Sequence, residues 1–245
     1  MVLSHAEQLH LAMQPAFGLA YLSSRGILHL DVAARNCLVG KGNVVKVADF
    51  GMAQRLAPDK STWTPAAPLK IPIKWSSLEA LQAQQFSQAS DVWSYGVLAW
   101  EVLSLGTVPY SGVHNQLVLP KLLAGERLSK PDNAFPALYQ ICLQCWHPEP
   151  KSRPKFQKIA QHLRDQLNGL PSDQLKHIRD LGATLATRGG STASLPAGMA
   201  RAAPHQRRTS QPQQQQQEQR RKEQKRTQQQ LHLLQQAHAQ GTEQS

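Results

Sequence analysis

Three polar side chains in the first quarter of this 245-residue chain have types and a spacing that suit chemistry. Asp31 and Asn36 lie in the run His-Leu-Asp-Val-Ala-Ala-Arg-Asn, and Asp49 follows Asn36 by thirteen positions, at the start of Asp-Phe-Gly. A carboxylate can accept the proton of a hydroxyl group. Carboxylate and amide oxygens are also ligands that Mg²⁺ accepts in proteins. Side chains of these types therefore suit a metal-assisted reaction at a hydroxyl group.

The two motifs resemble the catalytic loop H-R-D-x-x-x-x-N and the D-F-G motif of protein kinases. Ala33-Ala34-Arg35 and Ile71–Trp75 resemble the forms that these segments take in tyrosine kinases. The resemblance covers about Leu9–Leu167 and implies the C-terminal lobe of a protein tyrosine kinase, an enzyme that phosphorylates protein tyrosine with ATP. The other matching blocks, in chain order, are Lys46–Gln54, Ile71–Leu81, Ser90–Gly96, Pro109-Tyr110, Cys145-Trp146 and Arg153-Pro154.

The resemblance also implies a role for each residue of the motifs. Asp31 would be the catalytic base, and Arg35 would support both Asp31 and the substrate hydroxyl. Asn36 and Asp49 would hold Mg²⁺ and, through it, ATP. Five further residues would have structural roles: His29 in the catalytic loop, Phe50 under the site, Asp91 as the anchor of the loop backbone, and Glu79 with Arg153 as a buried salt bridge.

The sequence departs from the kinase pattern at the activation segment, which follows Asp-Phe-Gly. Leu30 replaces the arginine that receives the activation-loop phosphate, and the chain has no tyrosine between Gly51 and Trp75. The A-P-E motif reads Ser77-Leu78-Glu79, so its proline is absent and its glutamate is retained. These departures favour a narrower resemblance to receptor tyrosine pseudokinases, of which the off-track-like receptors are one group.

The ATP-gripping N-terminal lobe of a kinase has no counterpart in these 245 residues. Gly40-Lys41-Gly42 lacks the third glycine of G-x-G-x-x-G, no V-A-I-K strand precedes the catalytic loop, and Lys46 and Lys74 come too late to be the ATP lysine. Phosphoryl transfer depends on positioning and on electrostatic stabilisation of the phosphates. We therefore expect this chain alone to be inactive, with weak or absent binding of ATP and Mg²⁺.

Two functions remain open. One is a tyrosine kinase whose N-lobe or other upstream domains lie outside this sequence and whose partner is a protein substrate. The other is a non-catalytic pseudokinase scaffold that binds a signalling partner of a receptor. A glycine-rich loop and its lysine, found in frame upstream of Met1, would favour the enzyme.

The expected fold class is mainly α: a protein-kinase-like C-terminal lobe of helices with a small β-ribbon. Ser4-x-x-Glu7 predicts a capping box at the start of the helix His5–Ser24, and Pro15 predicts a kink within it. The stretch Asp91–Leu105 is apolar nearly all round apart from Glu101, which predicts a central buried helix. The other expected elements are helices Leu117–Leu123, Ala137–Trp146 and Phe156–Leu167, strands Ile27-Leu28, Cys37–Val39 and Val44–Val47, and an exposed loop Met52–Leu69.

Composition divides the chain into a lobe (1–168), a transition segment (169–188) and a tail (189–245). The tail has no Phe, Trp, Tyr, Ile, Val or Cys, so it buries too little apolar surface to fold, and we expect a disordered basic Gln-rich segment. It carries eight Lys or Arg residues against three acids. Arg220–Lys222 with Lys225-Arg226 would suit nucleic acid or nuclear import, but a solvated tail is the simpler interpretation, and no nucleic-acid role is expected.

Three cysteines in 245 residues do not suggest a disulfide framework, which favours a reducing compartment. Cys142 and Cys145 lack the second ligand pair that a zinc site needs, so we expect them in the core. No apolar run reaches the ~18 residues of a membrane span. We therefore expect no membrane segment in this chain and a cytoplasmic location, either as a free protein or as the intracellular part of a membrane receptor.

Overall fold

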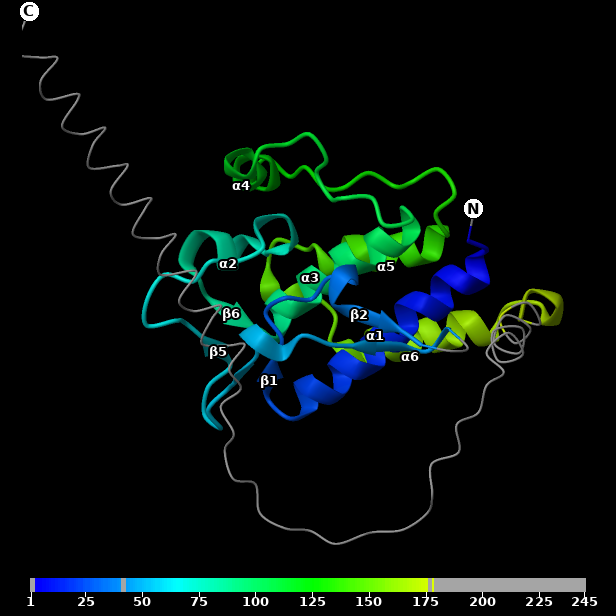
Figure 1. The fold of residues 1–245 in the computed structure, drawn as a ribbon, viewed down its shortest axis with the longest axis horizontal. Helices are drawn as coiled ribbons and strands as arrows, with labels where there is room; N and C mark the ends of the chain where they lie inside the picture. Colours follow the sequence, from blue (N-terminus) through cyan, green and yellow to red (C-terminus); the bar gives the residue numbers. More distant parts are fainter. Residues whose placement is uncertain (1–2, 41–42, 176–177, 179–245) are drawn as a thin grey trace, which may run out of the picture. The chain divides into compact units, whose positions relative to one another are not determined.

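The computed structural model of the chain describes residues 3–40, 43–175 and 178. These residues form a mainly helical lobe with three two-stranded antiparallel ribbons, which confirms the expected fold class (Figure 1). The α-helices are α1 His5–Ser24, α2 Leu78–Ala83, α3 Gln88–Leu103, α4 Asn115–Leu123, α5 Pro136–Cys145 and α6 Phe156–Asn168. The strands are β1 Ile27–Leu28, β2 Cys37–Val39, β3 Val45–Val47, β4 Gln54–Arg55, β5 Thr62–Trp63 and β6 Phe86–Ser87.

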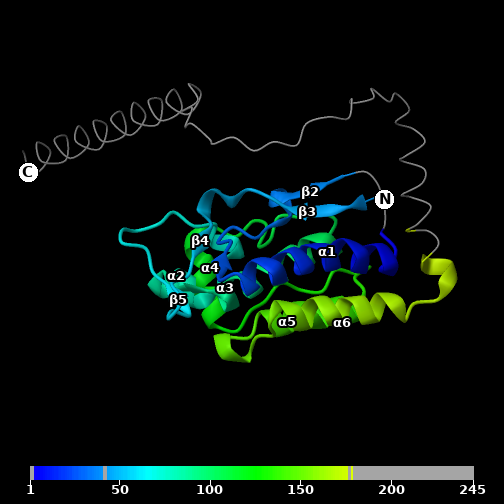
Figure 2. The ribbon, with the colours of Figure 1, turned by 90° about the horizontal axis from the view of Figure 1, so that it is seen from below.

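Helix α1 begins at the expected capping box. The Ser4 hydroxyl accepts the Glu7 N–H at 3.3 Å, and the Glu7 carboxylate accepts the Ser4 N–H at 2.8 Å. The helix continues through Pro15. Three residues earlier, the Ala12 carbonyl accepts a hydrogen bond from the buried Tyr95 hydroxyl at 2.9 Å. Helix α1 packs along α6 on one side and against β3 on the other (Figure 2).

Helix α3 is the centre of the core, as its apolar sequence predicts. Thirteen of its sixteen residues are buried, and it packs against α5. The helices approach closely at Gly96, where an added Cβ would lie 2.7 Å from Cβ of Cys145 and from Nε1 of Trp146. Cys142 and Cys145 are fully buried free thiols, which confirms their prediction as core residues.

The β2–β3 hairpin carries the segment that joins the two motifs. Cys37 pairs with Val47, so the residues that flank the pair, Asn36 and Ala48, meet at the same end of the ribbon. Gln14 of α1 holds the hairpin, because its amide donates to the Asn43 carbonyl at 2.8 Å and accepts the Val45 N–H at 2.9 Å.

The expected exposed loop over Met52–Leu69 is confirmed for most of its length, but two short strands that the sequence did not predict interrupt it. Strand β4 pairs with β1, and β5 pairs with β6, with Trp63 opposite Phe86. Both ribbons are only two residues long, which is too short for an alternating pattern to show in sequence. The larger apolar residues of this segment are half-buried, namely Met52, Leu56, Trp63 and Leu69.

Several sequence predictions lie wholly or partly outside the described residues. The transition segment 169–188 is described only to residue 175 and at residue 178, and the tail 189–245 is not described. Within the described ranges, no helix combines the length and the apolar character needed to cross a membrane.

Candidate active site

Asp31, Arg35 and Asn36 lie together at a single turn of 3₁₀ helix, Ala34–Asn36. The Arg35 guanidinium forms an ion pair with one carboxylate oxygen of Asp31. The Asn36 amide donates to the other carboxylate oxygen at 2.8 Å and to the Asp31 carbonyl at 2.7 Å. The Asp31 carboxylate is thus held from two sides, with its orientation fixed by its own loop.

Asp91, in the first turn of α3, anchors the backbone just before Asp31. Its two oxygens accept the His29 N–H at 2.7 Å and the Leu30 N–H at 3.0 Å. Leu30 has φ 66°, a left-handed backbone conformation that residues other than glycine rarely adopt. Burial raises the pKa of Asp91 to about 6, against the lowering effect of the two backbone N–H groups. The anchor expected from the resemblance is therefore present in the geometry.

His29 connects the catalytic loop to the segment that carries Asp49. Its Nε2 lies 3.0 Å from the Ala48 carbonyl, and its Nδ1 lies 3.4 Å from the Asp31 N–H. Burial lowers the pKa of His29, although the Ala48 carbonyl and the charges of Asp31 and Asp49 raise it. A carbonyl only accepts and an amide N–H only donates, so the neutral ring must carry its proton on Nε2.

Asn36 and Asp49 present oxygens that fit a magnesium ion. The Asn36 amide nitrogen is used on Asp31, which leaves its carbonyl oxygen for a metal, and the Ala48 N–H donates to the Asn36 backbone at 2.8 Å. Asp49 is exposed, has a left-handed backbone and accepts the Gly51 N–H at 3.3 Å. The described residues contain no group of three or more His, Cys, Asp or Glu placed to hold a metal. Magnesium keeps several waters and binds through one or two carboxylates plus phosphate, so this sparse set suits it.

Phe50 was expected to pack under this site. Its ring lies 5.2 Å from the His29 ring, centroid to centroid, in a tilted arrangement. Its side chain is nevertheless 50% exposed. The residue therefore contacts the catalytic loop on one face, and its other face is open to solvent in this structure.

The sequence argument missed Glu101, a buried residue of α3. One of its carboxylate oxygens accepts the Ala34 N–H at 2.8 Å and the Trp75 indole N–H at 3.0 Å. The Arg35 guanidinium lies over the Trp75 ring, 4.4 Å from its centroid. The available signal was a charged residue in the middle of the apolar stretch that follows Asp91, because a buried charge needs partners.

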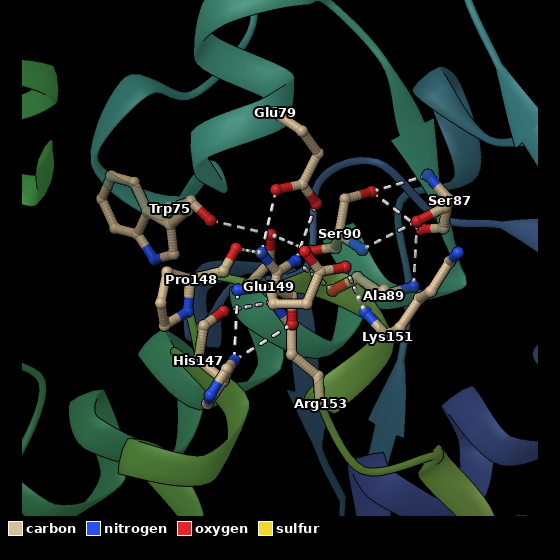
Figure 3. Close-up of polar contacts among 11 residues, drawn as sticks. Trp75, Glu79, Ser87, Ala89, Ser90, His147, Pro148, Glu149, Lys151 and Arg153 are labelled. Carbon is tan, nitrogen blue, oxygen red and sulfur yellow. Dashed lines mark hydrogen bonds and ion pairs between the residues drawn. The ribbon is translucent and has the colours of Figure 1, made fainter.

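Glu79 and Arg153 form the expected salt bridge, with the Arg153 side chain fully buried (Figure 3). The guanidinium donates to the two Glu79 oxygens at 2.7 and 2.9 Å. It also donates to the carbonyls of Ala89, His147 and Pro148. The pair thus joins α2 to the start of α3 and to the loop before α6.

Leu30 lies in an apolar cluster where the resemblance would place an arginine. Its side chain is 6% exposed, and partly buried apolar residues of the segment after Asp49 pack against the cluster. Gln84 secures the same segment farther on, because its amide donates to the Leu69 carbonyl at 2.8 Å and accepts the Leu69 N–H at 2.9 Å. The members of this Leu30 cluster are Leu28, Leu30, Ala80 and Phe86, with Met52, Leu56, Trp63, Leu69 and Ile71 packed against them.

Comparison with known proteins agrees with this arrangement of loop, hairpin and buried helix. The family model for protein tyrosine and serine/threonine kinases matches residues 1–163, from α1 into α6. The chain therefore belongs to the protein kinase family.

Its relatives include tyrosine kinases of several kinds. Tyrosine-protein kinase FRK of Homo sapiens is 42% identical over 160 residues, which cover 65% of this chain and 32% of FRK. Vascular endothelial growth factor receptor 1 of Rattus norvegicus is 40% identical over 186 residues, 76% of this chain and 14% of the receptor. Tyrosine-protein kinase abl-1 of Caenorhabditis elegans is 42% identical over 177 residues, 70% of this chain and 14% of abl-1. The chain thus spans a third or less of each of these relatives.

Proposed function

We propose that this chain is the catalytic C-terminal lobe of a protein tyrosine kinase, which phosphorylates tyrosine in protein substrates when an N-lobe is supplied. The observation that carries the proposal is the held carboxylate of Asp31. Arg35 and Asn36 bind its two oxygens, and Asp91 anchors the backbone before it. A kinase-derived domain that does not catalyse phosphoryl transfer would not need a carboxylate oriented in this way.

The residues of the site have distinct tasks in this mechanism. Asp31 accepts the proton of the substrate hydroxyl as the hydroxyl oxygen attacks the γ-phosphorus of ATP, the bond from this phosphorus to the β-phosphate oxygen breaks, and ADP leaves. Arg35 keeps the Asp31 carboxylate oriented. Asn36 and Asp49 would hold Mg²⁺, which would neutralise charge on the ATP phosphates. Orientation of the reacting groups contributes a large share of the rate in such a reaction.

The described residues supply only one side of a nucleotide site. Leu38 and Val39 of β2 and Phe50, the residue after Asp49, are exposed, and this sequence contains no glycine-rich loop to cover them. The electrostatic part of catalysis is correspondingly incomplete. The 245-residue chain alone is therefore inactive. The location that we propose for the active form is the cytoplasm, either as a free protein or as the intracellular part of a receptor.

The test is to join this chain to the N-lobe of a tyrosine kinase relative and to assay peptides that differ only in tyrosine or serine at the acceptor position. We expect phosphorylation of the tyrosine peptide and its loss by at least about a thousandfold in Asp31→Asn, because the general base is removed. Lys121→Ala, which removes an exposed ion pair with Glu126, is the control. Equal activity of the Asp31→Asn protein would refute the assignment.

A second function is favoured by Leu30 and by Ser77-Leu78 in place of Ala-Pro, since both change regulatory or structural motifs of active kinases. In that case the lobe is a pseudokinase scaffold for receptor signalling. A folded, joined protein that binds Mg·ATP but transfers no phosphate to any tyrosine peptide would support this alternative.

The same departures bear on regulation. Leu30 cannot bind a phosphate, and the possible acceptors Ser61, Thr62 and Thr64 are exposed. Without an arginine, a phosphate on them lacks the usual partner for a charge-assisted bond. Activity of the joined protein should therefore be unchanged by phosphatase treatment and by alanine at all three positions. A tenfold drop in either measurement would show that a phosphate switch exists.

A further inference from the structure

Glu101 is a charged side chain in the centre of the core, with no place in the chemistry described above. It is 7% exposed and lies between buried residues of α3. Burial raises the pKa of Glu101, whereas the bonds from Trp75 and Ala34 and the charge of Arg35 lower it. An apolar residue would suit this helix better unless the carboxylate has a task of its own.

One oxygen of Glu101 joins two segments that are far apart in the sequence. The Ala34 N–H, three residues after Asp31, and the Trp75 indole N–H donate to the same Oε2, at 2.8 and 3.0 Å. Ala34 belongs to the catalytic loop, and Trp75 ends the segment Ile71–Trp75. Bonds to an ionised acceptor are short and strong, so they restrict both donors.

The link extends from Trp75 to the carboxylate of Asp31. The Arg35 guanidinium stacks over the Trp75 ring at 4.4 Å and forms the ion pair with Asp31. The Trp75 ring therefore limits where Arg35 can lie, and Arg35 limits the orientation of Asp31. Ser94 lies about two turns of α3 before Glu101. Its hydroxyl donates to the Trp75 carbonyl at 2.7 Å and so holds the same residue by its backbone.

We propose that Glu101 is a positioning residue that fixes Ile71–Trp75 relative to the catalytic loop, so that a substrate hydroxyl meets Asp31. Its consequence for catalysis rests on the proposed function, but the link itself does not. Glutamine can still accept both N–H groups, though without charge, whereas leucine can accept neither. The two substitutions therefore separate the hydrogen bonds from the volume of the side chain.

The test uses the full 245-residue chain with ¹⁵N-labelled tryptophan and backbone amides. Trp75→Phe assigns the Trp75 indole signal among the five tryptophans. In Glu101→Leu we expect this signal to shift. We also expect the Trp75 indole and the Ala34 amide to exchange hydrogen at least about tenfold faster than in wild type. The exchange rates of Glu101→Gln should lie between those of Glu101→Leu and wild type.

Tyr95→Phe is the matched control, because it deletes a buried hydrogen bond from the same helix to Ala12. Its Trp75 indole and Ala34 amide should behave as in wild type. The proposal is overturned if both groups are unchanged in Glu101→Leu, or if Tyr95→Phe accelerates them equally, since the effect would then be general loosening.

A second measurement, in the protein joined to an N-lobe, concerns the substrate. Glu101→Gln should raise KM for a tyrosine peptide at least about threefold and leave KM for ATP unchanged, because the neutral bonds hold Trp75 less firmly. An equal rise in both would overturn a role specific to the protein substrate. If the wild-type joined protein transfers no phosphate, the proposed function fails, and the exchange experiment still decides whether Glu101 holds the two segments.

Discussion

The Arg153 guanidinium uses all five of its N–H donors, two on Glu79 and three on backbone carbonyls. Burying a charge is costly, and only a complete set of partners offsets the lost hydration. The guanidinium carbon of Arg153 also lies 5.0 Å from the ring centroid of Trp93, a residue of the buried helix α3. The side chain therefore holds three segments in one geometry, and its removal leaves Glu79 without its partner.

We expect Arg153→Ala to lower the free energy of unfolding by about 3–5 kcal/mol, the usual cost of breaking a buried ion pair. The matched control is Lys121→Ala, whose pair with Glu126 is exposed and should contribute less than about 1 kcal/mol. Chemical denaturation of both variants measures the difference. A loss from Arg153→Ala as small as that from Lys121→Ala would show that the buried pair adds no net stability.

Asp91 predicts a dependence of stability on pH. Because its pKa is raised from 3.8 to about 6, the folded chain binds this proton more tightly than the unfolded chain does. The stability from this group is fully present below pH 3.8 and is lost as the pH rises through 6, a decrease of about 3 kcal/mol for two pKa units.

The measurement is the difference in unfolding free energy between wild type and Asp91→Asn from pH 3.5 to 7. Other acids, Glu101 included, titrate in both proteins and cancel in this difference. We expect wild type to lose stability relative to Asp91→Asn as the pH rises. A constant difference would mean that the Asp91 pKa is not raised.

Short elements hold the activation segment without a phosphate. Strands β4 and β5 each have two residues, too few to be stable alone, and their pairing depends on the Leu30 cluster beneath them. The Trp63 and Phe86 rings lie 5.7 Å apart across the β5–β6 ribbon. Apolar burial thus takes the place that an arginine and a phosphate have in the kinase pattern.

Leu30→Arg should loosen this segment, because it inserts a charge among apolar side chains. We expect amides at Trp63 and Leu69 to exchange hydrogen at least about tenfold faster than in wild type, from the loss of packing. Leu30→Met, which nearly conserves volume, is the control and should have little effect. Equal protection in wild type and Leu30→Arg would contradict the role of the cluster.

The proposed function implies that the described residues supply only half of a nucleotide site. In the proposed function Asn36 and Asp49 would hold Mg²⁺, whereas Leu38, Val39 and Phe50 are exposed. Affinity for Mg·ATP should therefore be about millimolar or weaker, ~−4 kcal/mol. Calorimetry measures it, and micromolar affinity that Asp49→Ala removes would show that this chain completes the site by itself.

The boundary of the lobe is a further proposal, and its basis is composition. Helix α6 ends at Asn168, where the predicted lobe also ends. Residues 189–245 lack the apolar side chains that a core needs. Limited proteolysis should leave a fragment that ends between about residues 165 and 190, because exposed chain without a core is cut first. Protection of Gln213–Gln230 in the isolated protein would contradict a disordered tail.

The amino-acid sequence by itself predicted the features that depend on near neighbours. The capping box sets the start of α1, the apolar pattern identifies α3, and the hairpin follows from two short apolar runs. The spacing of Asp31 and Asn36 likewise fits within one turn, so their contact needed no distant partner. The kinase family followed from the order of such motifs.

Contacts between distant segments required the folded structure. Glu101 acquires its task only because α3 brings it against Ala34 and Trp75, 67 and 26 positions away. The ribbons of the activation segment exist because tertiary burial stabilises strands too short to form alone. Local sequence encodes backbone preference and polarity, whereas the partner of a buried charge or of a short strand depends on which surfaces the packed helices bring together.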